Sequence, residues 1–274
     1  KLFASLKESS ILRQAQDKFF NFQFSKKPKI QKTIIANLDD GNAGYFLGFK
    51  AQEKIGASFE GKTNQACNQI YQAHRTEQGF ELDGVTPVRE PMAALNSDGF
   101  LKPFVSASQL SSEGFSNGVK FEVKLIGKFN NYNALLATAA ANSLGVPLVD
   151  CASALSAFTK IRGRMEPVEN HRGISIFVDY GCEPVSIEAA LKAASELPHN
   201  RIVHVFGSTG GHRDKQKRFI FGQISAKYAD EIIITNDDVY DSDAEEIAKD
   251  IESGIRNQEL WRGNYQIILD RRVA

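Results

Sequence analysis

The chain has 274 residues, with 33 Lys and Arg against 33 Asp and Glu, so its formal net charge is zero. Hydrophobic residues make up 42% and charged residues 24%, which is typical of a soluble globular protein and excludes a disordered or collagen-like chain. Zero net charge gives no overall attraction to nucleic acid or to an anionic membrane surface, so we expect neither as a partner.

The three cysteines, Cys67, Cys151 and Cys182, are far apart and form no CxxC pair. This spacing argues against a disulfide framework or a structural zinc site and suits a reducing compartment. No apolar stretch approaches the roughly 18 residues that a membrane span needs. The chain begins without Met and stops just after a predicted strand, so we expect it to be a fragment of a longer protein.

The first part of the chain, residues 1–161, has the weaker pattern. Its predicted elements, in chain order, are a strand at 34–38, a weak helix at 44–54, short strands and loops over 56–118, a strand at 121–125, a helix from about 130 to the break at Gly145, and a helix at 148–158. The long helix is predicted because its apolar residues share one face at helical spacing.

The second part, residues 162–274, alternates strands and helices. Strands are predicted at 174–178, 202–206, 231–235 and 265–269, and helices at 184–197, 215–228 and 243–254. Nearly continuous apolar strands that alternate with helices are typical of a parallel sheet covered on both faces. We therefore predict an α/β protein with a Rossmann-like parallel sheet in the second part, preceded by part of another α/β domain.

Three polar segments follow three of these strands. The first strand ends in Asp179-Tyr180, and we name the stretch from there to residue 183 the aspartate segment. We name the other two the glycine loop (207–215) and the acidic loop (236–241). Right-handed crossovers place the carboxyl ends of parallel strands at one edge of the sheet, which is where open α/β sheets bind ligands. The three segments therefore predict a binding site at that edge.

Each segment has two interpretations. In the glycine loop, free backbone N–H groups and a helix start beside Arg213, Lys215 and Lys217 suit a phosphate or a carboxylate, but a tight turn with solvated basic residues is the alternative. Asp179 could bind a ribose hydroxyl or cap the next helix. The acidic loop lacks the Gly and Glu of a calcium-binding EF-hand, so its carboxylates could hold an ammonium group, or cap the helix that starts near Asp243.

Residues 56–63 match the phosphate-loop pattern GxxxxGK[ST]. A phosphate loop needs an apolar strand before it, whereas residues 49–55 are polar and look helical, and Phe59 and Glu60 add bulk and negative charge. We interpret the match as chance and keep an unrelated P-loop NTPase as an alternative. The histidines show no metal-ligand spacing, and His204, inside an apolar strand, is expected to pack rather than to react.

Several stretches resemble the Mur ligase family in their order and spacing. They are GKFNNYNALLA (127–137), GRMEPV (163–168), FVDYGCEP (177–184), GSTGGHRDKQKR (207–218) and ITNDDVYDSD (234–243). The resemblance is strongest to the branch that forms UDP-N-acetylmuramoyl-tripeptide, and it covers about residues 120–274. Residues 1–55 match more loosely the later part of the family's central ATPase domain, so we expect a partial central domain over 1–161 and a truncated C-terminal ligase domain over 162–274.

The resemblance implies an activity and its substrates. The enzyme would be a cytoplasmic ligase of peptidoglycan synthesis that uses ATP and Mg²⁺. It would add the third amino acid to a UDP-N-acetylmuramoyl-dipeptide, through an acyl phosphate that the amine of the incoming amino acid attacks. Such a reaction relies mostly on positioning and charge neutralisation by the protein.

On the nucleotide side, the resemblance implies roles for four residues. Asn130 and Asn133 match asparagines that contact ATP. Arg164 matches an arginine that reaches the nucleotide from the C-terminal domain, and Asp179 matches an aspartate near the ribose.

On the side of the incoming amino acid, Arg213 matches an arginine that contacts its carboxylate, and Lys215 matches a lysine near the phosphates. We take Arg164 and Lys215 as the catalytic candidates. The other predicted substrate-binding residues are Gly210, Gly211, Asp237, Asp238 and Tyr240.

The chain also departs from the family pattern. The usual AHT after Asp179 is GCE here, and DNPR in the acidic loop becomes DDVY, which removes the arginine that marks diaminopimelate users. We therefore expect a basic third amino acid rather than diaminopimelate. The family's phosphate loop and metal ligands would lie before residue 1, so we expect no metal ligands in this chain and no activity from it alone. A non-catalytic relative that binds a nucleotide or a partner is the other alternative.

Overall fold

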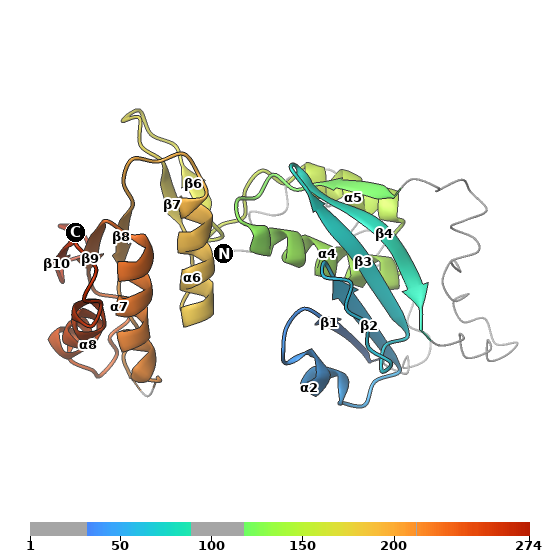
Figure 1. The fold of residues 1–274 in the computed structure, drawn as a ribbon, viewed down its shortest axis with the longest axis horizontal. Coiled ribbons are helices and arrows are strands. Elements are labelled where there is room, and N and C mark those ends of the chain that lie inside the picture. The colour runs from blue at the N-terminus through green and yellow to red at the C-terminus, as the bar shows by residue number, and fades with distance from the viewer. Residues whose placement is uncertain (1–31, 89–117, 212) are drawn as a thin grey trace, which may run out of the picture.

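The computed structural model describes residues 32–88, 118–211 and 213–274, and Figure 1 shows their arrangement. The loosely matching first 31 residues and the predicted loops over 89–117 lie outside the described residues. The glycine loop is described except for residue 212.

The first part is built on a five-stranded sheet in the order β1-β2-β3-β4-β5. The strands are β1 (Thr33–Asn37), β2 (Glu53–Ser58), β3 (Gln69–Thr76), β4 (Gly79–Pro87) and β5 (Val119–Glu122). β1, β2 and β3 are parallel, whereas β4 and β5 continue the sheet in antiparallel pairing.

Helices lie on both faces of this first sheet (Figure 1). On one face, α4 (Lys128–Ser143) and α5 (Leu148–Ser156) bury Leu135, Ala139 and Leu148 against Ile55, Tyr71 and Phe80 of the strands. On the other, the short helix α2 (Ala43–Leu47) buries Leu47 in a smaller cluster with Leu38 and Ile70.

Two predicted boundaries in the first part are wrong. The predicted helix over 44–54 ends at Leu47, and its last two residues belong to β2 instead. The polar start of β2 hid this strand, because Glu53 and Lys54 sit at its entry before four buried residues. The strand predicted at 121–125 begins and ends earlier, as Val119–Glu122.

In the second part, the alternation of strands and helices is confirmed, and so is the α/β fold class with a parallel sheet. The elements are β6 (Glu166–Val168), β7 (Ile176–Val178), α6 (Pro184–Ser195), β8 (Val203–Phe206), α7 (Gln216–Tyr228), β9 (Glu231–Ile234), α8 (Ala244–Arg256) and β10 (Asn264–Ile267). β8, β9 and β10 form a parallel sheet in the order β10-β9-β8.

Two details of this sheet differ from the prediction. The strand predicted at 174–178 pairs antiparallel with β6 in a separate ribbon rather than joining the parallel sheet. The three helices pack on one face of the sheet, where Phe206, Ile232 and Ile234 meet them. On the other face, Val203 and Val205 stay 44% and 49% exposed.

The two parts meet where α4 begins and α6 ends. Lys128 Nζ lies 2.8 Å from a carboxylate oxygen of Glu196. A Cβ added to Gly127 would lie 3.2 Å from that of Ala193, so the backbone of α4's first turn approaches α6 closely. Within the described ranges, we find no helix with the length and apolar content that a bilayer crossing requires.

Candidate functional site

Hydrogen bonds join the glycine loop to the acidic loop and its next residue at the carboxyl ends of β8 and β9. Gly210 N–H donates to the carbonyl oxygen of Asp238 (2.9 Å), and Gly211 N–H donates to Oγ of Ser242 (2.8 Å). A Cβ at Gly210 would lie 2.0 Å from the carbonyl oxygen of Val239, so only glycine allows this approach. The predicted edge therefore exists, with these two loops in backbone contact.

The side chains at this edge include charges of both signs. Arg213 and Asp238 are exposed and Asp237 is half-buried, and none of the three has a side-chain hydrogen bond or ion pair among the described residues. Tyr240 adopts a left-handed φ of 50° and stays 70% exposed, with its ring beside Gly211. A free guanidinium and free carboxylates on two loops at the same edge suit a zwitterion such as an amino acid.

Lys215, by contrast, already has a partner. Its Nζ lies 2.8 Å from a carboxylate oxygen of Glu246 in the first turns of α8. The hydrogen bond from Lys215 lowers the pKa of the Glu246 carboxyl below its ordinary value. Both side chains are more than half exposed, so the pair is a weak restraint that a phosphate could displace.

Asp243 is the N-cap of α8. Helix capping was one of the two interpretations of the acidic carboxylates before this helix. The Asp243 side chain accepts a hydrogen bond from the backbone N–H of Glu245 (2.7 Å). This bond satisfies one of the free donors of the helix terminus and sets where the acidic loop ends.

Asp179 fixes the start of the aspartate segment rather than capping a helix. One carboxylate oxygen accepts from Met165 N–H (2.8 Å) and the other from Gly181 N–H (2.7 Å). The N-cap of α6 is Glu183, so the capping interpretation of Asp179 is wrong. Because Met165 follows Arg164, Asp179 also holds the turn that carries this predicted nucleotide-binding arginine.

The other predicted nucleotide residues lie in different environments. Arg164 is exposed, and its guanidinium donates only to the carbonyl oxygen of Gly163 among the described residues (3.3 Å). Asn130 is buried, and its amide group bonds Ile126 O (2.7 Å) and Asn133 (3.1 Å). Asn130 therefore holds the start of α4, and Asn133 is the more accessible of the two asparagines.

A carboxylate outside the predicted set ties α4 to the first sheet. Asp39, after β1, accepts from Ser58 Oγ (2.6 Å), from Phe59 N–H (2.8 Å) and from Tyr132 Oη (2.9 Å). Burial alone would raise the pKa of Asp39, but these hydrogen bonds outweigh it and lower the pKa. The anchored residue, Tyr132, is next to Asn133, so Asp39 helps to place the part of α4 that carries this predicted nucleotide-binding residue.

The phosphate-loop match at residues 56–63 does not form a phosphate loop. A strand does lead into it, contrary to the prediction, because β2 covers residues 53–58 and so begins three residues before the match. No helix follows, since the chain runs through a loop directly into β3. Lys62, which would have to reach a phosphate, lies 2.9 Å from a carboxylate oxygen of Glu60.

The sequence analysis did not predict that two cations at the start of α7 are buried. The side chain of Lys217 is 5% exposed, and that of Arg218 is fully buried and lies 2.9 Å from Asp250 of α8. The signal was present in the sequence, because positions 218, 221, 222 and 225 share one helical face and all four are buried. The basic run around them suggested solvent exposure instead.

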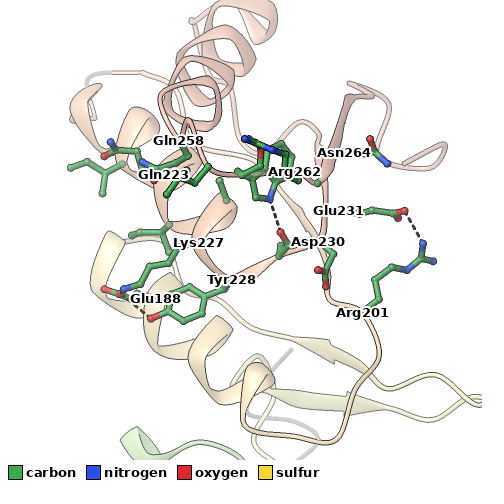
Figure 2. Close-up of a pocket in the computed structure, with 17 residues that line it drawn as sticks. Glu188, Arg201, Gln223, Lys227, Tyr228, Asp230, Glu231, Gln258, Arg262 and Asn264 are labelled. Atoms are coloured by element: carbon green, nitrogen blue, oxygen red, sulfur yellow. Dashed lines mark hydrogen bonds and ion pairs between the residues drawn. The ribbon is translucent and has the colours of Figure 1, made fainter.

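A hollow of about 870 Å³ lies away from these loops, near the amino ends of the parallel strands (Figure 2). Four of its six charged side chains are in ion pairs, since Lys227 lies 2.6 Å from Glu188 and Arg201 lies 2.7 Å from Glu231. The other two, Asp230 and Arg262, bond only to backbone groups among the described residues. None of the site residues predicted from the sequence lines this hollow, so the candidate site stays at the carboxyl edge. Among the described residues, no three His, Cys, Asp or Glu side chains are grouped to hold a metal ion.

The second part of the chain is similar in sequence to a known protein family. Residues 163–274 match the family described as "Mur ligase, glutamate ligase domain". The chain is 37% identical over 185 residues to the UDP-N-acetylmuramoyl-L-alanyl-D-glutamate–2,6-diaminopimelate ligase of Caldanaerobacter subterraneus, covering 64% of this chain and 37% of that protein. The enzyme of the same name from Clostridioides difficile is 38% identical over 148 residues, or 54% of this chain and 30% of that one.

Solved structures support the fold. The chain is similar to UDP-N-acetylmuramate-alanine ligase from Thermotoga maritima, with a TM-score of 0.53 and 18% identity, over 87% of this chain and 43% of that one. It is also similar to folylpolyglutamate synthase from Thermotoga maritima, with a TM-score of 0.54 and 11% identity, over 87% of this chain and 53% of that one. The chain spans little more than a third of the length of the first curated relative.

Proposed function

We propose, on the premise that residues 163–274 belong to the Mur ligase, glutamate ligase domain family, that the protein joins an amino acid to a peptide carboxylate at the expense of ATP. The proposed product is the UDP-N-acetylmuramoyl-tripeptide, and the proposed acceptor is the UDP-N-acetylmuramoyl-dipeptide. We also propose that residues 1–161 are part of a central ATPase-type domain and that residues 162–274 are a ligase domain.

The contact between the glycine loop and the acidic loop carries this proposal. Through the bond between Gly210 and Asp238, it brings a free guanidinium and free carboxylates to the same edge. In our proposal Arg213 binds the carboxylate of the incoming amino acid, while Asp237 holds its ammonium group. Tyr240, whose ring lies beside Gly211, would cover the bound amino acid. Amide formation then depends on holding the deprotonated amine close to the activated carboxyl carbon.

The nucleotide would lie between the two parts of the chain. Arg164 fits a phosphate because it is exposed and donates only to a neighbouring carbonyl among the described residues. We propose that Asn133, Arg164 and Asp179 hold ATP and that Lys215 neutralises phosphate charge after leaving Glu246. ATP supplies the phosphoryl group that activates the peptide carboxylate. The described residues offer no set of ligands for Mg²⁺, so we assign no step to the metal.

A domain exchange tests the proposal. We would replace the matching segment of the Caldanaerobacter ligase by residues 163–274 and measure ADP release that requires both the dipeptide and an amino acid. We expect ligation, and we expect Arg213→Ala to raise the KM for the amino acid about 10- to 100-fold, because one charge-assisted carboxylate contact is lost. The matched control is Arg201→Ala, whose guanidinium pairs with Glu231 at the opposite edge.

A chimera that folds and binds ATP but never ligates would reject the enzymatic proposal. It would favour instead a relative that binds a nucleotide or a partner without turnover. If Arg201→Ala raised the KM as much as Arg213→Ala, the amino-acid site would have to lie elsewhere.

Substrate choice follows from the charges of the acidic loop. Diaminopimelate carries a second carboxylate, but at this corner the chain offers Tyr240, which has no positive charge, beside the exposed carboxylates of Asp238 and Asp241. We therefore expect a higher kcat/KM for lysine than for diaminopimelate in the chimera, by about tenfold or more. Amino-acid competition measures this ratio. Tyr240→Arg should shift it toward diaminopimelate, and a wild-type preference for diaminopimelate would contradict the prediction.

A further inference from the structure

Lys217 connects α7 to the aspartate segment through a buried ammonium group. Its side chain is 5% exposed, and its Nζ lies 3.2 Å from the carbonyl oxygen of Cys182 and 3.2 Å from a carboxylate oxygen of Glu183. The ammonium also lies 5.9 Å from the ring centroid of Phe221. Both acceptors belong to the aspartate segment, so this one side chain ties that segment to the start of α7, directly after the glycine loop.

Burial makes this connection stiff. A lysine in water moves freely, but a buried ammonium must keep its acceptors because leaving it unpaired is costly. Lys217 is the second residue of α7 and follows the end of the glycine loop almost directly. A shift of the aspartate segment relative to the glycine loop would therefore strip the ammonium of both acceptors.

The aspartate segment, which carries both acceptors of Lys217, is also held in place by its own hydrogen bonds. Glu183 is the N-cap of α6, with a capping box to Ser186, so its backbone cannot rotate freely. At the other end of the same segment, Asp179 holds the N–H groups of Met165 and Gly181. The segment is thus fixed at both ends, and Lys217 adds its attachment to the β8–α7 unit.

We propose that Lys217 and Glu183 are positioning residues that set the placement of Asp179 relative to the glycine loop. They touch no substrate in this proposal; they couple the nucleotide side of the site to the amino-acid side. The functional consequence rests on the proposed ligase activity, whereas the structural coupling does not.

Amide hydrogen exchange in the intact chain tests the coupling. We expect Lys217→Met and Glu183→Gln to accelerate exchange of the Gly181 and Met165 amides about tenfold, while the α8 amides of Ile251 and Ile255 stay unchanged. Lys217→Arg, which keeps the charge, should restore most of the protection. The matched control is Lys227→Met on the same helix, which removes an exposed ion pair to Glu188 and should leave the Gly181 amide unaffected.

Glu183→Gln keeps the test decisive if Lys217→Met does not fold, because the Glu183 side chain is 60% exposed and the bond from the backbone N–H of residue 183 to Ser186 Oγ is kept. Acceleration spread evenly over the second part would show a general loss of stability and overturn the proposal. Unchanged exchange at Gly181 and Met165 in both variants would overturn it as well.

The chimera supplies the functional readout. Glu183→Gln should raise the KM for ATP several-fold with little change in kcat, since the groups that contact the reacting atoms are intact. A chimera without activity combined with the expected exchange pattern would reject the proposed function and leave the coupling standing. An active chimera with an unchanged KM for ATP would overturn the positioning role alone.

Discussion

Replacing Gly222 by alanine is expected to lower the free energy of unfolding of the second part by about 2–4 kcal/mol. A Cβ at this position would lie 2.1 Å from the carbonyl oxygen of Ile251 and 2.9 Å from the backbone nitrogen of Ile255. Both are backbone atoms of α8, so no side chain can rotate away to make room. The helices would have to separate, and the buried side chains between them would lose contact.

Gly254 of α8 makes the reciprocal contact. A Cβ there would lie 2.0 Å from the carbonyl oxygen of Phe219 in α7. Each helix thus presents a glycine to the backbone of the other, and Gly254→Ala should destabilise to a similar extent. Separation would also pull the fully buried Arg218 away from Asp250, which lies 2.9 Å from its guanidinium.

Urea unfolding monitored by Trp261 fluorescence measures this effect, because Trp261 is the single tryptophan of the chain and packs against the core of α7, α8 and β9. The matched control is Gly44→Ala in α2, where nothing lies within 4 Å of the new Cβ. That variant should be neutral or more stable by up to about 1 kcal/mol, from helix propensity. Equal stabilities of Gly222→Ala and wild type would show that α7 and α8 are not packed this closely.

The sequence predicted the second part well where local pattern and tertiary structure agree. The strand at Val203–Phe206 and the helices Gln216–Tyr228 and Ala244–Arg256 begin and end within two residues of their predicted limits. Their apolar spacing is unambiguous, and Asp243 gives the start of α8 a cap that can be read from the chain. The polar segments at the carboxyl edge were predicted for the same reason, since connection handedness fixes where strand ends fall.

What the sequence did not predict depends on contacts between distant residues. β6 has only three residues, one of them Pro167, and its antiparallel pairing with β7 leaves no periodic signal. The burial of Lys217 depends on where Cys182 and Glu183 lie, 34 or 35 residues earlier in the chain. The capping interpretation of Asp179 failed similarly, because its partner Met165 is 14 residues away.

Acid is expected to destabilise the second part through His204, between pH 6.5 and pH 4.5. The imidazole stacks on Phe206 with centroids 4.2 Å apart, and its Nδ1 lies 3.0 Å from Oγ of Ser225. Burial lowers the pKa of His204 to about 4. The prediction that this histidine packs inside the sheet is confirmed, and the lowered pKa means that the folded protein holds it neutral.

The direction of the effect follows from proton binding. Above about pH 6.5 neither state binds a proton at His204, so the residue has no pH-dependent effect on stability. Below that pH the unfolded chain is protonated while the folded chain stays neutral until about pH 4, so stability falls with pH. At about 1.4 kcal/mol per pH unit, the loss reaches about 2–3 kcal/mol at pH 4.5.

Urea titrations at pH 7.0, 6.0, 5.0 and 4.5, again followed by Trp261, measure the slope. His204→Gln cannot titrate, and its side-chain amide can still donate to Oγ of Ser225, whose own proton goes to the carbonyl oxygen of Phe221. Its stability should therefore fall much less steeply with acid than that of the wild type. His199→Gln, at an exposed histidine, should keep the wild-type slope. Unfolded glutamates begin to take up protons at the lower end of this range, so the effect of His204 is read as the difference in slope between wild type and His204→Gln. If His204→Gln lost stability with acid as steeply as wild type, another group would carry the effect, and His204 would be protonated in the folded state.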